Sequence, residues 1–74
     1  MRYFFHVRLE GGIALDHEGQ ECGSPAQACV EAMVIASELG TEFASNEPWV
    51  VPHSVEVISD EGHAVCSAAV ELKP

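Results

Sequence analysis

The stretch Ser24–Ala44, SPAQACVEAMVIASELGTEFA, decides the fold that this sequence predicts. Ser24 is suited to cap a helix, Pro25 favours the first helical position, and Gln27 completes a capping box. At 100° per residue, one arc of this helix collects apolar side chains, and the opposite arc collects Gln27, Glu31, Glu38 and Glu42. The apolar arc consists of Ala28, Cys29, Ala32, Met33, Ala36, Leu39 and Phe43. We therefore expect an amphipathic helix whose alanine-rich side lies close against a sheet.

Two strands are predicted before this helix. Residues Tyr3–Leu9 alternate between apolar and mixed side chains, with aromatic and β-branched residues that favour a strand. Glu10-Gly11-Gly12 is a turn signal, because glycine adopts positive φ without strain. Residues 13–16 then return as a second strand, with Ile13 and Leu15 on the buried face, and residues 21–22 resume it after a turn at 17–20.

Two more strands are predicted after the helix. Ser54–Ser59 alternates with Val55 and Val57 inward, and Ala64–Leu72 returns beside it. The intervening hairpin turn places Gly62 where positive φ is needed. The order ββαββ predicts a single α+β domain over residues 1–74, in which one amphipathic helix packs on one face of a four-stranded antiparallel sheet.

The charge of the chain excludes several kinds of partner. Twelve acidic residues against three basic ones give a formal net charge of -9. Binding to nucleic acid relies on Lys and Arg that neutralise phosphates, and binding to anionic membranes relies on the same residues, so we expect neither. No apolar run approaches the roughly 20 residues of a membrane span, and no export signal is evident. We expect a cytoplasmic protein.

The cysteines and histidines do not show the spacing of a metal or catalytic site. With three cysteines and no export signal, we expect reduced thiols, and Cys29 falls in the apolar arc as a small core residue. No close cysteine pair, HExxH helix or phosphate-binding loop occurs, so we expect no cofactor and no enzymatic activity. An alternative function is a domain that responds to a small ligand or a divalent metal. It would use scattered histidines and the acidic turns, namely His6, His17, His63, Asp16, Glu18, Asp60 and Glu61.

Two groups of residues are candidates for an interaction surface. Phe4, His6 and Arg8 alternate with the inward residues of the first strand, so they point to the face away from the helix, and Ile58 and Cys66 are placed there with them. Val30 and Val34 lie one turn apart on the helix, outside its alanine arc. They are either isolated surface residues or a narrow ridge for another helix. We expect a non-enzymatic interaction module that forms a homodimer or binds another protein.

The sequence also resembles a family of small bacterial proteins of about this length, classed as a domain of unknown function. The resemblance covers most of the chain. The segments that carry it are residues 2–8 (RYFFHVR), Asp16-x-Glu18-Gly19, the helix from Ala28 to Leu39, and residues 55–62 (VEVISDEG). The chain departs from the family in its longer connector, Thr41 to His53, and in its more apolar helix. The resemblance implies the fold and a bacterial, cytoplasmic origin, and it supplies no catalytic residue.

Overall fold

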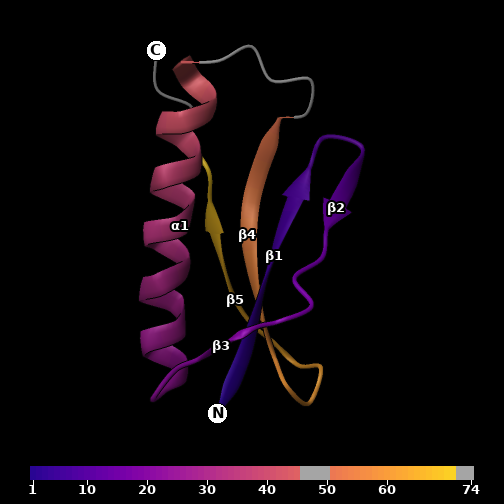
Figure 1. The fold of residues 1–74 in the computed structure, drawn as a ribbon, viewed down its shortest axis with the longest axis vertical. Coiled ribbons are helices and arrows are strands. Elements are labelled where there is room, and N and C mark those ends of the chain that lie inside the picture. The colour runs from indigo at the N-terminus through magenta and orange to yellow at the C-terminus, as the bar shows by residue number, and fades with distance from the viewer. Residues whose placement is uncertain (46–50, 72–74) are drawn as a thin grey trace.

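The computed structural model describes residues 1–45 and 51–71, and for residues 42–45 it describes the backbone alone. Its elements are β1 (Arg2–Leu9), β2 (Gly12–Ala14), β3 (Gln20–Glu21), α1 (Pro25–Ser45), β4 (Pro52–Ser59) and β5 (Ala64–Ala69). The sheet is antiparallel in the order β2-β1-β4-β5, and β3 pairs with β1 beyond the end of β2 (Figure 1). The α+β class is confirmed. The expected four strands in the order ββαββ are corrected, within the described residues, to five strands, three of them before the helix.

Helix α1 starts where its capping residues predict. The N–H of Gln27 donates to Ser24 Oγ at 3.1 Å, and Gln27 Oε1 in turn accepts the N–H of Gly23 at 2.7 Å. The second bond reaches one residue further back than the standard capping box. The first bond satisfies a backbone donor that the first helical turn leaves free, and the second ties Gly23, before the cap, to the helix.

The core lies on the sheet face that α1 covers, where the helix packs on β4 and β5 and where β1 also contributes side chains. Its buried members are Tyr3, Phe5, Cys22, Ala28, Ala32, Ala36, Val55 and Val57. The three alanines confirm the alanine-rich side of the helix as the buried one, and Val55 and Val57 face inward as expected. The side chain of Phe43 lies outside the described residues.

Gly40 shows how close the helix comes to the sheet. A Cβ at this position would meet the carbonyl oxygen of Glu71, just beyond β5, well inside contact distance. Gly40 is buried inside α1 rather than at its end, although glycine costs a helix about 1 kcal/mol relative to alanine. The close approach of the two backbones explains why glycine is needed there.

The first hairpin places two residues differently from the expectation. Leu9 pairs with Gly12, so the turn is two residues long and Ile13 pairs with Arg8 on the face away from the helix. Ile13 and Leu15 are therefore exposed rather than buried. Gly11 has the expected positive φ, and so does Gly62 in the second hairpin.

The second hairpin contains a β-bulge that turns Cys66 toward the helix. Ile58 pairs with Ala64, but Val57 pairs with Cys66, so β5 has one extra residue between these two pairs. Without the bulge, Cys66 would lie opposite Glu56 on the face away from the helix, where it was expected. Instead it shares the side of Val57 and faces α1. The last strand, β5, also ends earlier than the expected Leu72, at Ala69.

Candidate interaction surface

Phe4 and His6 lie together on the sheet face away from the helix, as expected, but the chain itself partly covers them. Their rings stack with centroids 6.4 Å apart and an interplanar angle of 18°. The backbone of Gly19 lies against the Phe4 ring, because a Cβ added there would come within 2.9 Å of Phe4 Cε1. Both side chains are half-buried. This part of the predicted surface therefore supports the loop after β2.

Asp16 holds that loop to β1 where no backbone pairing exists. One carboxylate oxygen accepts the N–H of Phe5 at 3.1 Å, and the other accepts the N–H groups of Glu18 and Gly19. The N–H of Asp16 donates to His6 Nδ1 at 2.9 Å. β2 pairs with one end of β1 and β3 pairs with the other end. Between them, hydrogen bonds to the side chains of Asp16 and His6 take the place of backbone hydrogen bonds.

These contacts set the ionisation of Asp16. Partial burial acts to raise the pKa of Asp16, but the N–H groups of Phe5, Gly19 and Glu18 stabilise its carboxylate, and His6 adds a smaller favourable charge. The net effect lowers the pKa of Asp16 below its ordinary value. The acidic turn therefore has a structural part in the fold.

Arg8 lies on the same sheet face and is paired within the chain. Its Nε donates to Glu56 Oε2 at 2.6 Å, and a second guanidinium nitrogen lies 3.4 Å from Glu56 Oε1. This side-chain hydrogen bond is the main cause that lowers the pKa of Glu56 and raises the pKa of Arg8. Arg8 therefore has an ion-pair partner within the chain on this sheet face.

Val30 and Val34 lie on the outer side of α1, well away from Phe4, His6 and Arg8. Val30 is 59 % exposed and Val34 is 48 % exposed. Met33 joins them at 63 % exposure, which corrects its expected place in the core. Ile35 packs against the core instead, so the buried arc is rotated away from Met33. We call Val30, Met33 and Val34 the helix ridge.

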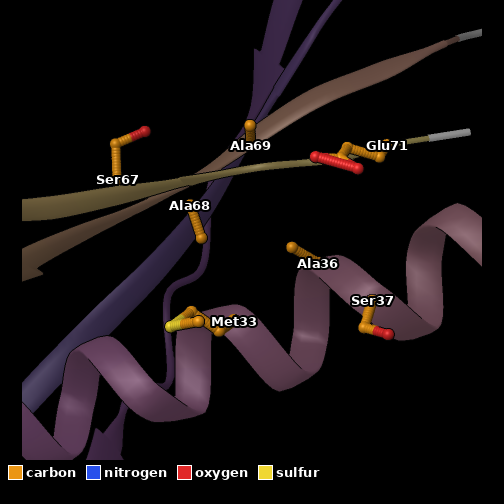
Figure 2. A pocket seen from close by; sticks show the side chains of 7 residues that line it. All are labelled: Met33, Ala36, Ser37, Ser67, Ala68, Ala69 and Glu71. Carbon is orange, nitrogen blue, oxygen red and sulfur yellow. The ribbon is translucent and has the colours of Figure 1, made fainter.

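A groove runs between the helix ridge and β5. It has a volume of about 390 Å³ and is lined by Met33, Ala36, Ser37, Ser67, Ala68, Ala69 and Glu71. Figure 2 shows Ala36 and Ala68 pointing toward each other across it, with Met33 and Ser37 on the helical wall. The small side chains on both walls leave the groove open, and Glu71 lies at one end.

A disulfide joins the two walls of this groove. Cys29 on α1 is bonded to Cys66 on β5, with Cα atoms 6.2 Å apart, and Cys22 is free and buried. The expectation of reduced thiols is therefore wrong for Cys29 and Cys66. The bulge that turns Cys66 toward the helix makes the bond geometrically possible.

The residues considered for a metal site remain dispersed. Within residues 1–45 and 51–71, no three His, Cys, Asp or Glu side chains gather as a metal ion would require. His6 Nδ1 already accepts the N–H of Asp16. In the same described residues, no helix is long and apolar enough to span a membrane.

Sequence reasoning missed Met33 and the groove beside it. On the helical wheel Met33 lies at the border between the alanine arc and the Val30/Val34 stripe, so its side was ambiguous. Its spacing from Val30 and Ser37 was the available signal, because residues three and four apart share a helix face.

Comparison with known families agrees with the resemblance found in the sequence. No curated protein and no solved structure matches the chain significantly. A family model described as a domain of unknown function, DUF6894, matches residues 2–71. That match includes every strand and the helix described above. The chain is therefore a member of the DUF6894 family.

Proposed function

We propose that this domain is a non-enzymatic interaction module that self-associates through the helix ridge. The observation that carries the proposal is the ridge itself: Val30, Met33 and Val34 are contiguous on α1, and each is about half exposed or more. A cluster of large apolar side chains on the surface of a small domain is typical of an interaction site.

The charge of the chain opposes self-association, so an apolar surface has to supply the attraction between two copies. Each copy carries a net charge of -9, and a contact through uncharged surface avoids placing acidic side chains directly opposite one another. The three ridge residues are uncharged, and Glu38 borders them in the shallow hollow that they line. A basic partner would be drawn to the acidic turns instead, whereas a second copy offers the ridge an equally apolar surface.

The test measures mass in solution. Sedimentation equilibrium at micromolar concentration should give about twice the chain mass of 7.9 kDa. Val34→Glu and Met33→Glu should shift the protein to a monomer, because each places like charges against one another across a symmetric contact. Leu15→Glu is the matched control, since Leu15 is 55 % exposed and lies outside the ridge. A wild-type monomer would refute the proposal, and so would equal effects of Leu15→Glu and Val34→Glu.

A further inference from the structure

The outer edge of β5 is open and lacks the usual protection of an edge strand. β5 is last in the sheet order, so no other strand in the described part of the chain pairs with that edge. Exposed edges in monomeric proteins are usually protected by charged residues or proline. β5, with the sequence AVCSAA, has neither along its whole length. The opposite edge is formed by two short strands and the Asp16 loop, which interrupt it.

The backbone of β5 has donors available for a new partner. The N–H of Val70 donates to the carbonyl of His53, and alternate residues of a strand direct their N–H groups to the same side. Ala68 and Val70 therefore face β4, while Ser67 and Ala69 direct their N–H groups outward. An antiparallel copy of β5 centred on Ser67 would satisfy these outward groups, and it would bring only small uncharged side chains together.

The position of α1 makes this pairing compatible with the helix ridge. α1 packs on both β4 and β5, and we take its axis to run over the line between them. Strands are about 4.8 Å apart, so a two-fold axis at the outer edge of β5 would place the two helix axes about 10 Å apart. Packed helices are separated by about 8–10 Å. Edge pairing and a ridge-to-ridge contact therefore fit the same dimer, with Met33 of each copy at the groove of the other.

Building on the proposed function, we infer that the partner is a second copy that adds its β5 antiparallel to the β5 edge. The two sheets become one continuous sheet, and the two α1 helices lie side by side over the seam. This arrangement closes after two copies, because a two-fold contact uses the same edge on both. Met33 of each copy enters the groove between α1 and β5 of the other, beside the contact between the two ridges.

Ser67→Pro tests the edge pairing directly. Proline removes the outward N–H of residue 67, and it leaves the bonds from β5 to β4 in place. Ser67→Ala is the matched control, since it keeps that N–H and removes only the hydroxyl. Sedimentation equilibrium should show Ser67→Pro as a monomer and Ser67→Ala as a dimer, both with the wild-type circular dichroism spectrum.

Amide hydrogen exchange on the wild-type protein gives a second measurement that does not depend on a variant folding. The exchange rates of the Ser67 and Ala69 amides should be at least about tenfold lower at concentrations that favour the dimer than at dilutions that favour the monomer. A dimer in which these two amides exchange equally fast at both concentrations would overturn the edge pairing and leave the proposed function standing. A wild-type monomer would overturn both.

Discussion

Opening the Cys29–Cys66 disulfide should remove a large part of the stability of this domain. The bond closes a loop with a sequence separation of 37 residues between α1 and β5. Losing such a loop constraint increases the entropy of the unfolded chain by about 13 cal/mol/K, or about 4 kcal/mol at 25 °C. A domain of 74 residues has a total free energy of unfolding of roughly 4–11 kcal/mol. The disulfide therefore accounts for about a third or more of the free energy of unfolding expected for a domain of this size.

The measurement is thermal unfolding followed by circular dichroism, with and without a reductant. For a domain of this size, a loss of 4 kcal/mol lowers Tm by about 15–30 °C. The double variant Cys29→Ala/Cys66→Ala should show a similar loss and no further response to reductant. Cys22→Ala is the control, because Cys22 is free and its replacement should leave the effect of the reductant intact.

Thiol titration checks the chemical premise of this prediction. The unfolded oxidised chain should show one reactive thiol, and the reduced chain should show three. Three reactive thiols before reduction would refute the disulfide. One thiol together with a Tm that reductant does not change would refute the loop-entropy reasoning. Because reducing compartments open such bonds, the domain should be less stable in a reducing compartment than in an oxidising one.

Three further substitutions test particular contacts. Gly40→Ala should lower the free energy of unfolding by at least about 1 kcal/mol in urea, despite the better helix propensity of alanine, because its methyl group would clash with the backbone beyond β5; a stabilised variant would contradict the close approach. Asp16→Asn should cost about 2 kcal/mol at pH 7, because it weakens acceptance of three N–H groups. Since the pKa of Asp16 is lower in the folded protein than in the unfolded chain, its contribution is complete above about pH 5 and disappears as the pH falls through the folded pKa. The free energy of unfolding, measured by urea titration at each pH from 7 to 2, should therefore decrease less steeply with falling pH for Asp16→Asn than for the wild type. An equal decrease in both proteins would contradict this role of Asp16. Gly19→Ala should also destabilise, because Gly19 has positive φ and touches the Phe4 ring; unchanged Tm would argue against that contact.

The sequence predicted the features that depend on neighbouring residues. Ser24 and Gln27 determine where the helix begins, and both hydrogen bonds lie within five residues of chain. The alternation of Val55 and Val57 likewise follows from the two-residue period of a strand. Such signals depend only on residues close together in the sequence, so they do not require knowledge of the tertiary contacts.

The errors arose where one residue of register decides which face a side chain occupies. A two-residue turn moved Ile13 to the outer face, and one bulge residue moved Cys66 to the inner face. Alternation alone does not reveal either shift, because turn length and bulges depend on how two strands meet. The disulfide was missed because the odd cysteine count and the lack of an export signal predicted reduced thiols, and because Cys66 was placed on the outer face.

The candidate surface was predicted in part. Val30 and Val34 were recognised because they fall outside the alanine arc, and both are exposed. The groove beside them depends on small residues from two elements far apart in sequence, Ala36 and Ala68. No spacing within one element reveals such a groove.

The covalent link between α1 and β5 also bears on proteolysis. A single backbone cut at any position between Cys29 and Cys66 leaves two fragments joined by the sulfur bridge. The nicked, oxidised molecule migrates as one species until a reductant separates its pieces. Backbone breaks within that loop are therefore visible by electrophoresis under reducing conditions and hidden without them.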